Sequence, residues 1–147
     1  MNDPSPRKLS AIQLANELRI ASNRLVRRLR TEKADHEVTD GQYAVLAFID
    51  RRGPQTLTSL SEYEGVKPPS MNRTVNCLVD AGYAVRDPDP DDGRQVRITL
   101  TAPGADIVRD TRRRRDAWLA TQVRRLDADQ RRTLAEAAAI LKEVAAK

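Results

Sequence analysis

Side chains that could read the edges of base pairs gather on one face of a helix predicted over residues 68–81. At 3.6 residues per turn, the apolar residues of this stretch fall on one side, while Asn72, Arg73 and Asn76 fall on the other. An arginine fork matches the O6 and N7 acceptors of guanine, and an asparagine matches N6 and N7 of adenine. Ser70 lies on the flank in the first turn, where the N-terminal end of a helix favours a phosphate. A solvated surface face is the alternative interpretation of this pattern.

A turn-rich loop over residues 87–95 ends in Asp-Asp-Gly-Arg and precedes an alternating segment. Its prolines and its Asp-Gly pair are strong turn formers, so we expect a hairpin tip that carries Arg94. Apolar and polar residues then alternate, which predicts a strand with one buried face. The apolar residues of that strand are Val96, Ile98 and Leu100. A hairpin arginine beside a helix with outward polar residues favours DNA binding over a merely solvated face.

The elements that would position these residues form a helix-turn-helix. Thr39-Asp40-Gly41-Gln42 is a capping box and starts a helix that stops at Gly53. Thr56 caps a short helix that ends at Gly65, and the helix over 68–81 opens on two prolines, which lose nothing in a first turn. In such a unit the second helix lies in the major groove of DNA. A short strand over residues 83–86 and the hairpin loop follow.

Long helices are predicted at both ends of the chain. Over Ser10–Glu32 a narrow apolar stripe recurs at spacings of three and four residues. After the hairpin come a helix over about 103–126, capped by Thr101, and a last helix capped by Asp127 or Asp129. A narrow stripe cannot bury itself in a domain this small, so we expect it to pack on another helix, including one from a second chain. The predicted fold class is mainly α with a small β-hairpin wing.

Composition and charge exclude several other classes of protein. The 147 residues carry a formal charge of +5 and have a pI near 9.8, which fits a polyanionic partner without requiring one. With one cysteine and one histidine, neither an internal disulfide nor a metal-binding cluster is expected. No catalytic residue set and no cofactor motif is present. No apolar run reaches the ~20 residues that span a bilayer, and no signal peptide precedes the helices. We therefore expect a soluble cytoplasmic protein that is not an enzyme and does not bind membranes.

Three motifs resemble the MarR family of winged helix-turn-helix regulators, and the resemblance covers nearly the whole chain. The segment Thr39-x-x-Gln42-x-x-Val45-Leu46-x-x-Ile49 resembles the start of the second helix of that family. The segment Val66-x-Pro68-Pro69-Ser70-x-x-Arg73-x-Val75-x-x-Leu78-x-x-x-Gly82 resembles its recognition helix. The most specific of the three is its wing, which is similar to Asp92-Gly93-Arg94 followed by Val96-x-Ile98-x-Leu100-Thr101.

The resemblance implies a homodimer that binds a double-stranded, pseudo-palindromic DNA operator. Residues 1–36 and 103–147 would form the dimerisation helices, and residues 37–102 the winged helix-turn-helix domain. It also implies that Arg94 enters the minor groove while Asp92 holds its guanidinium, a contact that reads groove shape rather than base identity. The expected DNA-binding residues are Ser70, Asn72, Arg73, Asn76, Asp92 and Arg94.

The same resemblance implies a repressor that leaves its operator when a small aromatic or phenolic ligand binds between the dimer base and the winged domain. Candidate ligand-binding residues are Tyr43, Leu46, Ala47, Arg86 and Trp118. Among them Arg86 would pair with an aromatic carboxylate, although a phosphate contact or a surface pair is an equally good role for it.

Two alternatives stay open at this point. Cys77 stands where the family commonly has an arginine and lies near Ser70 and Arg73 on the helix, so a redox-responsive regulator is the first. The second is a winged-helix module that binds proteins and has no affinity for DNA.

Overall fold

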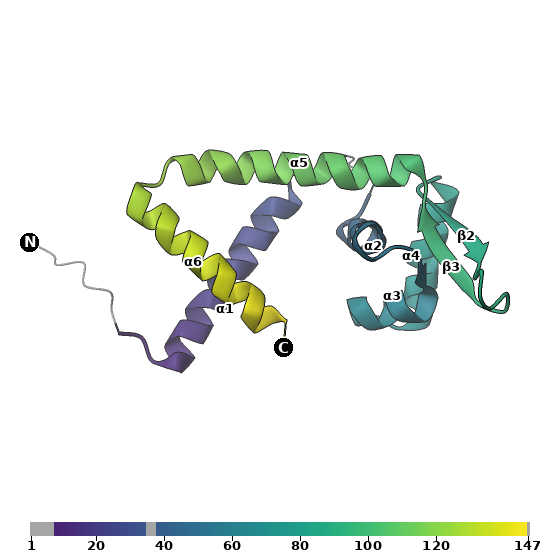
Figure 1. The fold of residues 1–147 in the computed structure, drawn as a ribbon, viewed down its shortest axis with the longest axis horizontal. Coiled ribbons are helices and arrows are strands. Elements are labelled where there is room, and N and C mark those ends of the chain that lie inside the picture. The colour runs from purple at the N-terminus through teal and green to yellow at the C-terminus, as the bar shows by residue number, and fades with distance from the viewer. Residues whose placement is uncertain (1–7, 35–37, 147) are drawn as a thin grey trace, which may run out of the picture. The chain divides into compact units, whose positions relative to one another are not determined.

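The computed structural model describes residues 8–34 and 38–146 (Figure 1). The chain divides into two compact units, residues 1–32 and 33–147. The first contains α1 (Ala11–Arg30), and the second contains all other elements. The sequence-predicted boundary between residues 36 and 37 lies outside the described residues.

Helix α1 begins at a capping box in which the Ser10 hydroxyl accepts from the Gln13 N–H and the Gln13 side chain accepts from the Ser10 N–H. It ends at Thr31, close to the predicted bounds. No residue of α1 is buried, and its leucines and isoleucines are exposed except for Leu29, which is half-buried. The narrow stripe is therefore present as predicted, and its packing on a second chain stays a prediction.

Helix α2 (Asp40–Arg52) contributes the largest share of the core of the second unit. The predicted capping box is present: the Thr39 hydroxyl accepts from the Gln42 N–H, and the Gln42 side chain accepts from the Thr39 N–H. The helix ends at Gly53, whose φ of 80° is a backbone conformation that suits glycine. Its buried residues are Val45, Leu46, Phe48 and Ile49.

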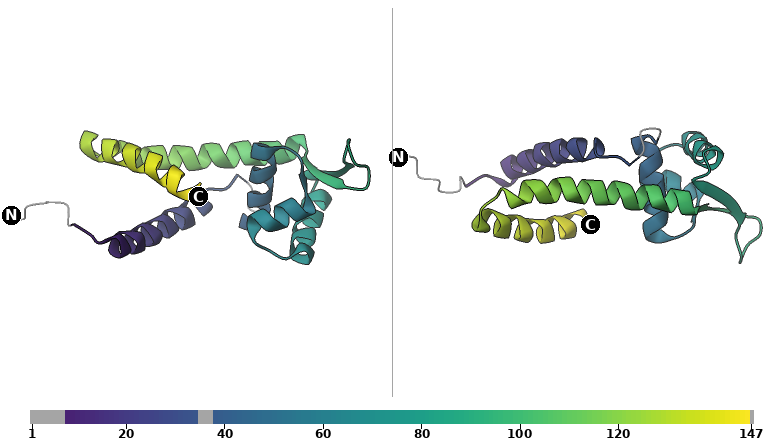
Figure 2. Two further views of the ribbon diagram at one scale, coloured as in Figure 1. Left: turned by 60° about the horizontal axis from the view of Figure 1, so that its bottom comes forward. Right: turned by 90° about the horizontal axis from the view of Figure 1, so that it is seen from above.

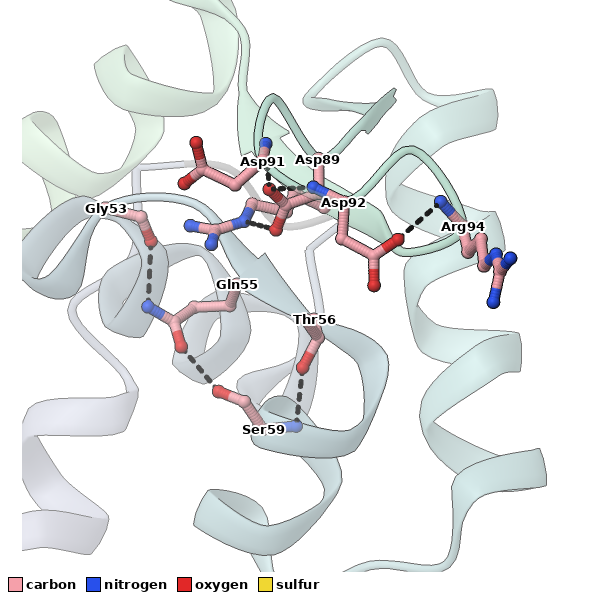
Figure 3. Close-up of polar contacts among 9 residues, drawn as sticks. Gly53, Gln55, Thr56, Ser59, Asp89, Asp91, Asp92 and Arg94 are labelled. Carbon is pink, nitrogen blue, oxygen red and sulfur yellow. Dashed lines mark hydrogen bonds and ion pairs between the residues drawn. The ribbon is translucent and has the colours of Figure 1, made fainter.

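The helix-turn-helix consists of α3 (Leu57–Glu64) and α4 (Pro68–Asp80). The Thr56 hydroxyl caps α3 by accepting from the Ser59 N–H at 3.1 Å (Figure 3). Gly65 ends α3 in the left-handed region with φ 65°, as the sequence predicts for a C-terminal glycine. The chain then turns directly into α4, so the two helices are joined by a tight turn.

Strands β1 (Gln55–Thr56), β2 (Ala84–Pro88) and β3 (Val96–Leu100) form an antiparallel sheet in the order β1-β3-β2. The sequence predicted the hairpin but not β1, because two residues are too few to show a period. Ile98 is fully buried as predicted. Val96 is 46% exposed, so the predicted burial of Val96 is wrong. The reason is that β3 extends beyond the core toward the wing tip, where no apolar layer faces it.

Helix α5 (Ala102–Arg124) packs on α2 through its first half, and α6 (Ala128–Ala145) follows after a turn. Asp127, not Asp129, caps α6 by a capping box with Gln130. In Figures 1 and 2, α5 runs away from the sheet and α6 turns back at an angle to it. No residue of α6 is buried, and its apolar residues include Ile140 at 60% and Val144 at 65% exposure. None of the helices among the described residues combines the length and the apolar character needed to cross a membrane.

A close approach between α5 and the turn that follows α4 predicts a sensitive position at Gly104. The carbonyl oxygen of Tyr83 occupies the space that a Cβ on Gly104 would need. We expect Gly104→Ala to lower the free energy of unfolding by about 1–3 kcal/mol, because the overlap is with backbone that cannot rotate away. Chemical denaturation at one fixed protein concentration measures this change.

Gly41→Ala is the matched control, because nothing lies within 4 Å of a Cβ at that helical position. It should raise stability by up to about 1 kcal/mol through helix propensity alone. Equal stabilities of the two variants would show that α5 does not approach Tyr83 as described.

Candidate nucleic-acid interface

The two faces of α4 are those the sequence predicts. Met71, Val75 and Leu78 are buried in the core against α2 and the sheet. The opposite face presents exposed polar side chains. They are Ser70, Asn72, Arg73 and Asn76. Burial of these three apolar side chains stabilises this orientation of α4. The favourable free energy of removing each from water is about 1.5–3 kcal/mol.

The first turn of α4 offers little backbone hydrogen bonding to an anion. Lys67 precedes the helix without a side-chain cap, and Pro68 and Pro69 carry no N–H. The Met71 N–H already donates to the Lys67 carbonyl at 3.1 Å. Ser70 therefore supplies both the hydroxyl and the backbone N–H of this turn, which concentrates any phosphate contact there on a single residue.

Arg86 on β2 lies against the exposed face of α4. Its Nη2 donates to Asn72 Oδ1 at 2.9 Å and to Asn76 Oδ1 at 2.7 Å. The sequence placed Arg86 among the candidate ligand-binding residues, whereas the structure brings it together with two of the predicted DNA-binding residues. A side chain on a strand after α4 gives no local signal of this contact, since it depends on how the strand returns past the helix.

The wing loop closes around the carboxylate of Asp89 (Figure 3). Asp89 is only 5% exposed. Its Oδ1 accepts from the backbone N–H groups of Asp91 at 2.8 Å and Asp92 at 3.3 Å, and its Oδ2 accepts from Arg97 Nε at 2.5 Å. The Asp89 N–H donates to the Gln95 carbonyl at 2.8 Å, which joins the two sides of the loop. An aspartate that accepts from the N–H two residues later is a turn-forming pattern, so Asp89-Pro90-Asp91 was a signal that the sequence reading missed.

Asp92 binds the main chain of Arg94 rather than its guanidinium. Asp92 Oδ1 accepts from the Arg94 backbone N–H at 3.1 Å, and Figure 3 shows the Arg94 side chain pointing away from that carboxylate. The expectation that Asp92 holds the guanidinium of Arg94 is therefore corrected. An aspartate side chain is short, and the backbone N–H two residues later is within its reach. Asp92 thus shapes the loop, and Arg94 is presented to solvent at the tip.

Hydrogen bonds hold the pKa of Asp89 below its usual value of 3.8. The largest cause is the bond from the Asp91 backbone N–H, followed by the bond from Arg97, and both favour the ionised form. Burial opposes them in part. The wing is therefore built around a carboxylate that is charged throughout the physiological range.

The predicted ligand-binding residues lie in different surroundings. Leu46 is fully buried in the core, and Tyr43 and Ala47 are half-buried on α2. The guanidinium of Arg115 on α5 stacks over the Tyr43 ring, 4.4 Å from its centroid. Trp118 is half-buried one turn further along α5. Their role in binding a ligand stays a prediction.

The described residues give less support to redox sensing or metal binding than to DNA binding. Cys77 is exposed on α4 beside the polar face, as predicted, and its redox role stays a prediction. Within residues 8–34 and 38–146, no group of three or more His, Cys, Asp or Glu side chains is placed to hold a metal ion.

The chain is similar in sequence to several known proteins. Residues 38–96 match the model of the MarR family. An uncharacterized HTH-type transcriptional regulator of Mycobacterium leprae is 36% identical over 92% of this chain and 94% of its own length. An HTH-type transcriptional regulator of Mycobacterium tuberculosis is 36% identical over 90% of this chain and 92% of its own length.

Solved structures share the fold. The crystal structure of RV1404 from Mycobacterium tuberculosis has a TM-score of 0.84 and 25% identity, over 95% of this chain and 97% of that chain. Wild-type MarR from E. coli in its apo form has a TM-score of 0.69 and 25% identity, over 92% and 97%.

The buried carboxylate predicts a pH-dependent wing. Because the pKa of Asp89 is lower in the folded protein, its contribution to stability is complete above pH 3.8 and is lost as the pH falls through the lower folded-state value. Asp89→Asn should destabilise the protein at neutral pH, since its amide would set a donor against Arg97 Nε. The unfolding free energies of wild type and Asp89→Asn, measured from neutral pH to below pH 3.8, should converge as the pH falls.

Asp91→Asn is the control, because it removes one negative charge from the same loop at an exposed position. A difference between wild type and Asp89→Asn that stays constant with pH would show that the carboxylate is not the group that closes the wing.

Proposed function

This chain belongs to the MarR family of transcriptional regulators, and from that premise we propose that it is a homodimeric repressor whose operator is released by a small ligand. Its relatives regulate transcription and are not enzymes. In this proposal residues 37–102 bind DNA as a winged helix-turn-helix. Residues 1–36 and 103–147 hold the dimer together.

One observation carries the DNA-binding part of the proposal. The same small core turns the polar face of α4 outward and anchors the sheet whose hairpin presents Arg94. A recognition helix fits the major groove of DNA, and an arginine beside it suits the negative potential of a narrow minor groove. In this arrangement Arg73 contacts base edges, Ser70 contacts a phosphate and Arg94 reads groove width.

Exposed apolar side chains support the dimer. Leucines of α1 and apolar residues of α6 are exposed in the single chain, although α6 is long and well formed. A helix that leaves several large apolar side chains exposed needs a partner to cover them, and such surface marks association sites. Two copies related by a twofold axis match a pseudo-palindrome when their α4 helices lie about 34 Å apart, one helical turn of DNA.

Release of the operator requires a ligand that binds better to a dimer with mismatched recognition helices. Tyr43, Ala47 and Trp118 are half-buried among the predicted ligand-binding residues, and an aromatic or phenolic compound suits them. Leu46 would touch a ligand only if α2 moved. Arg86 would bind a ligand carboxylate only by giving up its bonds to Asn72 and Asn76.

A salt titration of binding to promoter DNA tests the proposal. The logarithm of the association constant should fall linearly with the logarithm of the salt concentration, with a slope of about −0.9 per phosphate contact. A winged-helix module that binds only proteins would show no DNA binding even at low salt, and that result would overturn the proposal.

Arg94→Ala tests the wing. We expect operator binding to weaken by roughly 1–3 kcal/mol, the usual cost of losing one well-placed arginine, while the dimer seen by sedimentation stays intact. Arg109→Ala removes the same charge from an exposed position on α5 and serves as the control. Equal affinities for the Arg94 variant and the control would show that the wing does not contact DNA.

A further inference from the structure

One guanidinium nitrogen binds two side-chain amides on the exposed face of α4. An arginine NH2 group carries two hydrogens, and Arg86 Nη2 directs one to Asn72 Oδ1 and the other to Asn76 Oδ1. Both donor–acceptor distances, 2.9 and 2.7 Å, are ordinary for strong hydrogen bonds. Because the donor is charged, these bonds are stronger than those between neutral groups.

Both ends of this contact are held by the core. Asn72 and Asn76 are one turn apart on α4, whose neighbouring residues Met71 and Val75 are buried. Arg86 lies on β2 opposite Ile98 of β3, which is fully buried. Neither element can move away without exposing apolar side chains, so the backbones at both ends are fixed, and the two hydrogen bonds hold the exposed guanidinium against the amides.

The contact decides which part of each amide faces outward. An asparagine amide is planar, with an acceptor oxygen on one arm and a donor NH2 on the other. With each Oδ1 directed at β2, the Nδ2 groups of the exposed Asn72 and Asn76 side chains are left to face a partner. The outward face of α4 therefore offers hydrogen-bond donors at both positions.

We propose that Arg86 is a positioning residue which, by holding both carbonyl oxygens, makes Asn72 and Asn76 read the keto bases guanine and thymine instead of adenine. In the major groove, guanine presents O6 and N7 as acceptors and thymine presents O4, whereas cytosine presents an amino donor. Adenine needs a bidentate partner with both an acceptor and a donor. An amide whose oxygen is turned to β2 cannot present both atoms to one base.

This inference rests on the proposed DNA binding and revises the first expectation that these asparagines pair with adenine. Arg73, which has only donors, also selects guanine. Asn72, Arg73 and Asn76 therefore all present donors, and the operator half-site should be rich in guanine and thymine on the strand that α4 contacts.

Selection of bound DNA from a random pool tests the inference. Asn72→Ala and Asn76→Ala first identify the two base positions whose preference each side chain controls. Wild type should prefer guanine or thymine there by roughly tenfold, the usual effect of one well-made base contact. Arg86→Met removes the donors but keeps an unbranched stem, and it should bring this preference to within about twofold. Arg109→Met has the same charge change and should leave the preference as in wild type.

Asn76→Asp supplies a second test that does not depend on how well the Arg86 variant folds. One carboxylate oxygen keeps the bond to Arg86, and the other replaces an outward donor by an acceptor. The preference at the position controlled by residue 76 should then shift from keto bases toward cytosine, whose N4 donates to carboxylates.

The outcomes separate the two proposals. A wild-type preference for adenine at these positions, an unchanged keto preference in Arg86→Met, or no shift in Asn76→Asp would each overturn the role of Arg86 while leaving DNA binding in place. Weaker binding by Arg86→Met with unchanged preference would assign Arg86 to a phosphate contact and likewise overturn it. Failure of the wild type to bind any DNA would overturn the proposed function itself.

Discussion

Burial of one side of α4 is the constraint from which the rest of the interface follows. Met71, Val75 and Leu78 leave water only by facing α2 and the sheet, and the 3.6-residue period then turns the opposite face outward. The reverse arrangement would expose the apolar side of α4 and bury the charged Arg73 without a partner. Both changes raise the free energy of the folded state, and burial of an unpaired charge is the more unfavourable. The polar face is thus a consequence of the core and needs no separate device to hold it.

The wing depends on the same core at its base and on different forces at its tip. Ile98 anchors β3 in the core and pairs with Arg86 of β2. This strand register places Arg86 beside the exposed face of α4. Further out, Val96 is exposed and the apolar layer has ended. At the tip, the carboxylate of Asp89 stabilises the hairpin by accepting hydrogen bonds from Arg97 and from two loop N–H groups. Apolar burial sets where the hairpin starts, and charge-assisted hydrogen bonds set the shape of its end.

Local patterns predicted most of the elements. Thr39, Thr56 and Thr101 cap helices where the sequence indicates, and Gly65 adopts the positive φ expected at the end of α3. Strand β1 was missed because Gln55 acquires its role only by pairing with Ile98, far along the chain. The choice of Asp127 over Asp129 as the cap of α6 was likewise open until its partner Gln130 was seen in place.

The sequence by itself determined which residues are polar and outward on α4, and where the wing carries its arginine. Both depend on covalent geometry and on neighbours within one or two turns, which a single stretch of sequence contains. Only the tertiary structure decided that Arg86 holds the amides of Asn72 and Asn76. Such contacts depend on strand register and on the path by which distant segments meet, and those are set by packing of the whole core.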